Sequence, residues 1–155
     1  MILIAHRGNT VGRNPDKENN PDYIAKAIKQ GYDVEVDIWY LEGKLFLGHD
    51  NPDYLVDVNW LANHSNKLWI HCKNMDALSY FNEYEWNKSN QFNYFSHDKD
   101  LGVLTSHSYI WSTNLYDRGI LVLPELFNKE PLKGTIGICS DIVSNYKTNR
   151  AYTNE

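Results

Sequence analysis

The sequence has little cysteine, no long apolar run and no excess of positive charge. Two cysteines among 155 residues, Cys72 and Cys139, are too few for a disulfide framework, and we expect them to be packed free thiols. No apolar run reaches the roughly 18 residues of a membrane-spanning helix, and the apolar start at Met1 has no basic segment before it. The net charge of -5 argues against the basic face that general nucleic-acid binding requires. These absences predict a cytoplasmic protein with no stable membrane insertion and no nucleic-acid partner.

Apolar and aromatic residues are plentiful enough to build a core. Hydrophobic residues make up 42% of the chain, which argues against disorder. The length favours one domain, which we expect over residues 1–145, followed by a polar tail over residues 146–155. Aromatic residues reach 14%, and we expect their rings to cover surface that helices would otherwise cover.

The first half of the chain alternates between strand and helix patterns. Residues 2–5 form a short apolar run, and residues 33–39 alternate between acidic and apolar side chains, so both segments are typical of strands. Between them, Asn20 and Pro21 begin a helix that Gly31 ends. This order predicts parallel strands joined by helices.

The second half is rich in short strand patterns with little helix between them. Strand candidates over the whole chain centre near residues 2, 34, 69, 93, 103, 110, 121 and 137. That number of strands fits a closed barrel, but a full barrel of parallel strands and helices takes about 200 to 400 residues. We therefore predict the α/β class and a reduced TIM-type (β/α)8 barrel with several outer helices missing in the C-terminal half.

Reactive side chains follow the first three strands, at the end where barrel enzymes place their active sites. His6 ends the first strand, Glu35 and Asp37 lie on the second, and His71 and Lys73 end the third. Glu35 and Asp37 are two residues apart, so they share one face of a strand, where buried like charges need a cation. Carboxylates suit Mg²⁺, Ca²⁺ or Mn²⁺. The alternative is an edge strand whose acids are exposed to solvent.

Two histidines and two cations complete the candidate set. His6 and His49 are candidates for a general acid and base, because an unperturbed pKa near 6.5 suits both roles. Arg7 offers a bidentate fork for phosphate, and Lys73 adds a second positive charge.

Five further polar residues have less definite roles. His64 and His107 are expected in loops or on the surface, and His97 is undecided. Glu125 and Asp141 follow later strands, so they either face the same mouth or cap turns.

Four segments occur in the order and spacing of one known family. They are residues 4–8 (IAHRG), 18–19 (EN), 31–37 (GYDVEVD) and 47–50 (LGHD). Together they resemble the opening of the glycerophosphodiester phosphodiesterase family, within the PI-PLC-like phosphodiesterase superfamily. Two later segments are similar to the third-strand and last-strand motifs of that family, namely residues 69–73 (WIHCK) and 137–141 (GICSD).

The resemblance implies a metal-dependent phosphodiesterase, a hydrolase of lipid metabolism that acts on a small phosphodiester. In the family, a neighbouring hydroxyl of the substrate attacks phosphorus while one histidine takes its proton. The other histidine protonates the leaving alcohol, and a cyclic phosphate forms and is then hydrolysed. The implied roles are catalytic for His6 and His49, metal-binding for Glu35 and Asp37, phosphate-binding for Arg7 and Lys73, and supporting for Glu18.

One departure from the family concerns the metal. The family has a glutamate as third ligand where this chain has His71, so the site loses one negative charge and gains a softer ligand. One divalent ion is expected, Mg²⁺ or Ca²⁺ in the first place, with Mn²⁺ or Zn²⁺ better tolerated because of His71. A degraded metal site is the alternative.

The second departure is the short chain. It lacks the insertions that shape the family's substrate pocket, so we expect a shallow site and exposed apolar strand faces, which favour a homo-oligomer. Two other functions stay open: cleavage of a phospholipid, inositol or sphingolipid type of diester, or phosphate binding without catalysis on the same fold. The presence of both His6 and His49 favours an enzyme.

Overall fold

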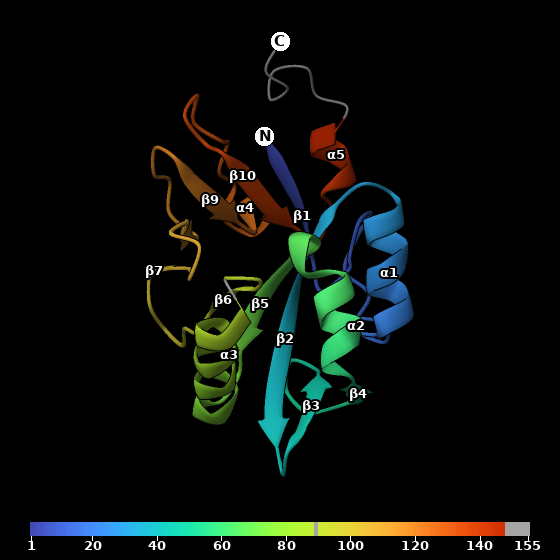
Figure 1. Ribbon diagram of the computed structural model, residues 1–155. Helices are drawn as coiled ribbons and strands as arrows, with labels where there is room; N and C mark the ends of the chain where they lie inside the picture. Colours follow the sequence, from blue (N-terminus) through green and yellow to red (C-terminus); the bar gives the residue numbers. More distant parts are fainter. Residues whose placement is uncertain (89, 148–155) are drawn as a thin grey trace.

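The computed structural model describes residues 1–88 and 90–147, and it is built around one sheet (Figure 1). The strands are β1 (Ile2–His6), β2 (Asp33–Leu41), β3 (Lys44–Leu47), β4 (Tyr54–Val56), β5 (Leu68–Cys72), β6 (Asn93–Phe95), β7 (Gly102–Leu104), β8 (Ile110–Ser112), β9 (Gly119–Val122) and β10 (Gly137–Ser140). The helices are α1 (Pro21–Lys29), α2 (Val58–Asn63), α3 (Met75–Lys88), α4 (Pro124–Phe127) and α5 (Ser144–Lys147), with a 3₁₀ turn at Ser65–Lys67. None of these helices is long and apolar enough to cross a membrane.

Most of the sheet is parallel. Strands β6, β5, β2, β1, β10, β9 and β8 are neighbours in that order, and each pair is parallel. Strand β7 pairs with β8 in the antiparallel direction, and β3 and β4 extend the far part of β2 as an antiparallel meander. The result is a mixed sheet that curls into a half-barrel.

The predicted reduced (β/α)8 TIM barrel is therefore wrong. The three longest described helices, α1, α2 and α3, lie around the first half of the sheet, whereas α4 and α5 span four residues each (Figure 1). The link at residues 105–109 is a short turn, and it joins β7 and β8 as an antiparallel hairpin. The link at residues 113–118 between the parallel strands β8 and β9 holds no helix either. The second half consequently has no outer layer of full-length helices.

Helix α1 begins where its cap residues predict. The Asn20 side chain accepts hydrogen bonds from the backbone N–H groups of Asp22 and Tyr23, and Pro21 occupies the first helical position. Gly31 follows the helix with a φ of 96°, a left-handed conformation that glycine adopts without strain. The helix buries Ile24 against the sheet and so fixes the loop between β1 and α1.

The sheet has an apolar layer on each face, and the alternation along β2 separates them. Val34, Val36 and Ile38 pack outwards against the helices. Glu35 and Asp37 lie on the other face, inside the curl.

Inside the curl, large aromatic rings form a second buried cluster. We call this group the aromatic plug; it comprises Trp69, Phe95 and Trp111. The ring of Trp111 on β8 lies 5.6 Å from that of Trp69 and 4.8 Å from that of Phe95, measured between ring centroids. The plug packs β5 and β6 against β8, which is not a neighbour of either strand in the sheet.

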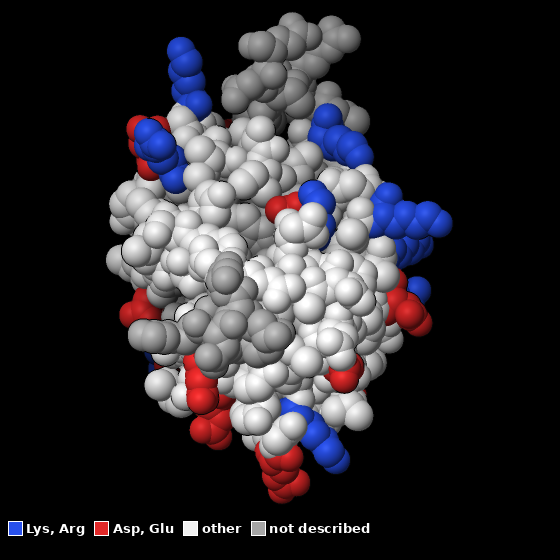
Figure 2. Space-filling model, viewed as in Figure 1, with Lys and Arg blue, Asp and Glu red and all other residues white. Residues whose placement is uncertain are grey.

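Positive charge does not form one patch on the face that Figure 2 shows. Lys and Arg side chains lie mainly toward the margins of this view, and acidic side chains lie between them (Figure 2).

The cysteines are both free and buried, which confirms the prediction of packed thiols.

Candidate functional site

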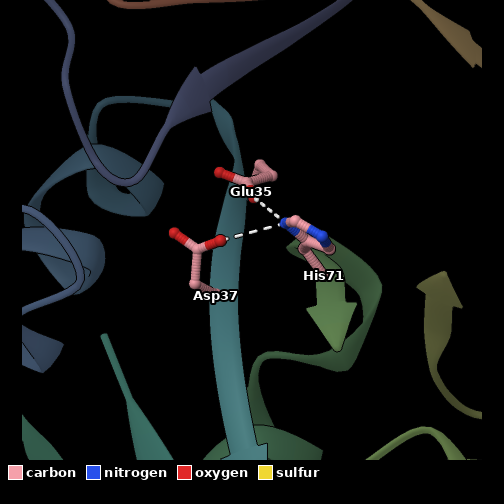
Figure 3. Close-up of side chains that lie close together, drawn as sticks. All are labelled: Glu35, Asp37 and His71. Carbon is pink, nitrogen blue, oxygen red and sulfur yellow. Dashed lines mark hydrogen bonds and ion pairs between the residues drawn. The ribbon is translucent and has the colours of Figure 1, made fainter. Parts of the chain in front are cut away.

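Three buried side chains form a cluster that can hold a metal ion (Figure 3). Glu35 and Asp37 project from β2 toward His71 on β5, and one ligand atom of each lies within 4.8 Å of the others. The strand register produces this arrangement, because Asp37 pairs directly with His71. His71 Nδ1 lies 3.0 Å from Asp37 Oδ1 and 3.8 Å from Glu35 Oε1. Among the described residues this is the one such cluster.

The two carboxylates differ in how well their charge is compensated. Burial alone would raise the pKa of Asp37, but the hydrogen bond from His71 and the charges of Arg7 and Lys73 hold it below its usual value. Burial raises the pKa of Glu35, and the nearby charge of Asp37 raises it further. Glu35 Oε2 is buried and has no hydrogen-bond partner among the described residues. A cation bound here would supply the missing partner, so the residues present fit a divalent ion.

A backbone carbonyl fixes the orientation of His71. His71 Nε2 lies 3.3 Å from the carbonyl oxygen of His97, which accepts the Nε2–H. The imidazole ring of His97 lies parallel to that of His71, with 4.4 Å between the ring centroids. Nδ1 is therefore the atom that faces the carboxylates, and His97, whose role the sequence left undecided, belongs to the site.

His6 is held by Asp141, from the other end of the chain. The distance from His6 Nδ1 to Asp141 Oδ1 is 2.7 Å, and His6 Nε2 lies 3.9 Å from Glu35 Oε2. Burial opposes a positive charge on His6, but the hydrogen bond to Asp141 and the charge of Glu35 outweigh it and raise the pKa of His6. Of the two roles left open for Asp141, the structure places it at the mouth.

Arg7 sits between two acids at the turn after β1. Its Nη1 lies 3.1 Å from Glu18 Oε2, and its Nε lies 3.0 Å from Asp37 Oδ2. The second contact is an ion pair and not a hydrogen bond, because the Nε–H is not aligned with the oxygen. Arg7 has a φ of 54°, a strained value for a residue other than glycine, and strain of this kind is found at functional sites.

Lys73 contacts the carboxylate of Asp37, and the loop that carries His49 is bonded to the Asp37 backbone. Lys73 Nζ lies 3.6 Å from Asp37 Oδ1. The loop that carries His49 is tied to β2, because the Gly48 N–H donates to the Asp37 carbonyl at 3.1 Å. Burial lowers the pKa of His49, and the positive charges of Arg7 and Lys73 oppose its protonation further, although Asp37 and Asp50 act in the opposite direction.

All eight residues that the sequence predicted for the site lie at this end of the sheet. Seven of them are joined by the contacts above, and His49 lies beside them with 38% of its side chain exposed and its Nδ1 2.7 Å from Asp50 Oδ1. His64 and His107 lie elsewhere, bonded to the backbone carbonyls of Trp60 and Asn90.

Sequence reasoning missed two asparagines. Asn19 is buried, donates to Asp37 Oδ2 and accepts from the Asp37 backbone N–H, both at 2.9 Å. Asn9 is buried too, and its amide donates to both Glu18 and Asp141. The pair Glu18-Asn19 belonged to the resemblance, so a signal for Asn19 was present, but nothing in the sequence marked Asn9.

Comparison of the chain with protein-family models, with curated proteins and with solved structures gave no match. The resemblance to the glycerophosphodiester phosphodiesterases thus stays a prediction. The wider assignments that it implied, to the hydrolases and to lipid metabolism, receive no support from these comparisons.

Proposed function

We propose that this protein is a metal-dependent phosphodiesterase that cleaves a glycerophosphodiester-like substrate by acid and base catalysis from two histidines. One observation carries the proposal: His6, Arg7 and the cluster of Glu35, Asp37 and His71 meet at one end of the curled sheet, with His49 beside them. A phosphodiester needs this combination, because its cleavage develops negative charge on phosphoryl oxygens and moves two protons.

One divalent ion is proposed to bind Glu35, Asp37 and His71. When bound, the ion would neutralise charge on the phosphoryl oxygens. Arg7 and Lys73 would bind the remaining phosphate oxygens. The imidazole ligand favours Mn²⁺ or Zn²⁺ over Ca²⁺, which prefers oxygen ligands and more of them.

The two histidines are proposed to divide the proton transfers. The carboxylate of Asp141 favours a proton on His6, which suits a general acid for the leaving alcohol. Burial favours neutral His49, and the positive charges of Arg7 and Lys73 act in the same direction, which suits a base that takes the proton of the attacking hydroxyl. With a hydroxyl of the substrate as nucleophile, the product is a cyclic phosphate, which a second step hydrolyses.

The test is turnover of glycerophosphocholine with Mg²⁺, Ca²⁺, Mn²⁺ and Zn²⁺. Bis(p-nitrophenyl) phosphate, which has no hydroxyl to attack phosphorus, is the comparison substrate and should not be cleaved by this route. His6→Ala and His49→Ala should each lower kcat by about 10² to 10⁴-fold with the far-ultraviolet circular dichroism unchanged. His64→Ala is the matched control and should keep wild-type rates, since His64 bonds only a backbone carbonyl in its own helix. Normal rates in either of the first two variants would remove the acid and base assignment.

Self-association and location complete the proposal. Large apolar side chains are exposed on the β7–β9 side and around α4, among them Leu101, Leu104, Leu126 and Phe127. Such surface supports a homo-oligomer.

Two reduced, buried thiols support a cytoplasmic location.

A further inference from the structure

A cavity of about 410 Å³ opens at the end of the curled sheet opposite the candidate site. Its walls come from the first residues of β1, β2, β5 and β6 and from the turn between β7 and β8. The candidate site follows the other ends of β1, β2 and β5, which are parallel. The volume lies in the range of about 300 to 1,000 Å³ that is typical of small-molecule sites. None of the eight predicted site residues lines this cavity, so it is separate from the proposed reaction centre.

Hydrogen bonds between β6 and the turn after β7 close one side of this cavity. The Ser106 N–H donates to the Tyr94 carbonyl at 2.8 Å, and Ser106 Oγ accepts from the Tyr94 N–H at 2.9 Å. Ser106 Oγ also donates to the Phe92 carbonyl at 3.1 Å. The neighbouring His107 N–H donates to Asn93 Oδ1 at 3.3 Å. These bonds give the cavity a fixed wall where the strands themselves do not pair.

Asn93 presents an unused hydrogen-bond donor to the cavity. This residue lines the cavity, and only 5% of it is exposed. Its Oδ1 accepts from His107, whereas its Nδ2 has no hydrogen-bond partner among the described residues. A nearly buried amide donor without a partner is unfavourable, so an acceptor on a ligand that enters the cavity would be bound there.

The charge of the lining indicates a neutral ligand. Among the described residues that line the cavity, Asp33 is the one acid, and none is lysine or arginine. The two carboxylate oxygens of Asp33 already lie 2.8 Å from Lys67 Nζ and 3.1 Å from Trp69 Nε1. His107 Nε2 donates to the Asn90 carbonyl at 3.2 Å, which leaves Nδ1 of the neutral ring as an acceptor. The cavity therefore offers a donor and an acceptor but no uncompensated charge.

The aromatic residues of the lining favour a sugar over a planar base. Only 4% of Trp69 is exposed, and its ring packs against Tyr109 and Trp111 with centroid distances of 5.0 and 5.6 Å. This packing leaves no open indole face on which a base could stack. A sugar ring has C–H groups that contact the edges of aromatic rings, and its hydroxyls both donate and accept hydrogen bonds.

We propose that this cavity is a binding site for an unphosphorylated, neutral sugar, one oxygen of which accepts a hydrogen bond from Asn93 Nδ2. Asn66, an exposed residue of the lining whose side chain has no hydrogen-bond partner among the described residues, binds a second hydroxyl. The site needs neither a metal ion nor a phosphate group, so it is independent of the proposed function.

Two substitutions remove these contacts in different ways. Asn93→Asp keeps an oxygen for the His107 N–H and replaces the donor with an acceptor. Asn66→Ala breaks no hydrogen bond among the described residues, so this variant should fold as the wild type does. Asn59→Ala is the matched control, because Asn59 is an exposed asparagine of α2 that does not line the cavity.

The probes are D-glucose, D-galactose, D-mannose and N-acetyl-D-glucosamine, each as the free sugar and as its methyl glycoside. Saturation-transfer NMR on the metal-free protein detects binding, and calorimetry measures Kd. At least one probe should bind to the wild type and equally to Asn59→Ala and His6→Ala. Its Kd should rise about 10-fold in Asn93→Asp and about 3-fold or more in Asn66→Ala. Binding of the glycoside as well as the free sugar would assign the site to the end unit of a sugar chain, and binding of the free sugar alone to a monosaccharide.

Three results would overturn the sugar site. The first is no binding of any probe by the wild type at concentrations up to about 10 mM. The second is an unchanged Kd in the folded Asn66→Ala together with an unchanged Kd in Asn93→Asp. The third is loss of the sugar in His6→Ala, which would place it at the reaction centre. Adenosine is the planar comparison and should not bind, and adenosine that displaces the sugar would contradict the argument from the buried indole.

Discussion

Glu35 and Asp37 are neighbours on one face of β2, yet they have different electrostatic surroundings. Asp37 lies within 4 Å of the cationic groups of Arg7 and Lys73, and Asn19 donates a hydrogen bond to it. Glu35 has two imidazole nitrogens within 4 Å, those of His6 and His71, and its buried Oε2 accepts no hydrogen bond from the described residues. Two residues that the sequence pattern treats alike therefore differ in the structure, where the charge of Asp37 is the better compensated of the two.

Removing the charge of Glu35 should weaken metal binding. Glu35→Gln is expected to lower the affinity for Mn²⁺ by at least about tenfold, because the ligand with the least compensated charge is lost. Titration calorimetry with the metal alone measures this, and Glu42→Gln should bind as the wild type does. Unchanged Mn²⁺ affinity would exclude Glu35 as a ligand.

The pair of His6 and Asp141 should stabilise the fold over a defined pH range. Despite burial, the pKa of His6 is raised above 6.5, so its contribution is complete below that pH and is lost as the pH rises through the folded value. Despite burial, the pKa of Asp141 is lowered below 3.8, so its contribution is complete above that pH and is lost as the pH falls. Both contributions are complete between these limits.

We therefore expect Asp141→Asn to be most destabilising at pH values between 3.8 and 6.5. In the metal-free variant the pKa of His6 should also fall, because burial then acts against the charge with less opposition. Unfolding in urea at several pH values and a proton NMR titration of the imidazole measure the two effects. A destabilisation independent of pH from 3 to 9 would contradict the assignment.

At the scale of elements, the sequence correctly predicted the strands and helices whose signals lie within a few neighbouring residues. The alternation in β2 and the cap residues of α1 each act within a few residues, and both elements formed where expected. Strands β6 to β9 have only three or four residues each, so pairing partner and direction depend on link length and on distant contacts.

The distinction between local patterns and distant contacts also holds for the residues of the site. Residues on strand ends were found because alternation decides which way they face, Arg7 and His49 were candidates from their own chemistry, and the resemblance added Glu18. Asn9 reaches the site by the loop after β1, whose geometry no short pattern encodes, and its partner Asp141 lies 132 residues away in the sequence. Glu125, which the sequence left open between the mouth and a turn, accepts hydrogen bonds from Ser140 and Asp141 at the turn after β10.

The loop that presents His49 depends on Gly48. This residue has a φ of 149°, and an added Cβ would lie 1.9 Å from the Asn51 carbonyl oxygen. Gly48→Ala should displace the loop and lower turnover by about 100-fold, while Mn²⁺ binding stays unchanged because no ligand lies on the loop.

Gly43→Ala is the matched comparison for that loop. Gly43 also has a left-handed φ, 76°, but nothing lies within 4 Å of an added Cβ. Gly43→Ala should lower the free energy of unfolding only by the backbone strain, about 1–2 kcal/mol, and the variant should keep full activity. Equal turnover in the two alanine variants would show that the position of His49 does not depend on Gly48.

For the whole molecule, the half-barrel leaves apolar surface that a complete ring of helices would cover. The leucines on β7 and α4 are exposed in a single chain. Sedimentation equilibrium at increasing concentration should show a mass above that of the monomer, and Leu104→Lys with Leu126→Lys should shift the equilibrium toward monomer. A monomer throughout, at concentrations of about 100 μM, would be evidence against the oligomer.

The aromatic plug gives the curled sheet an optical property of its own. Two indoles held 5.6 Å apart at a fixed interplanar angle of 29° couple their electronic transitions, so the near-ultraviolet dichroism reports whether Trp69 and Trp111 are packed together. Phe95 links that pair to His71, with ring centroids 5.3 Å apart, so the proposed ion, if bound at the imidazole, would change the electric field around the indoles. A change of intrinsic fluorescence on adding Mn²⁺ would then be expected.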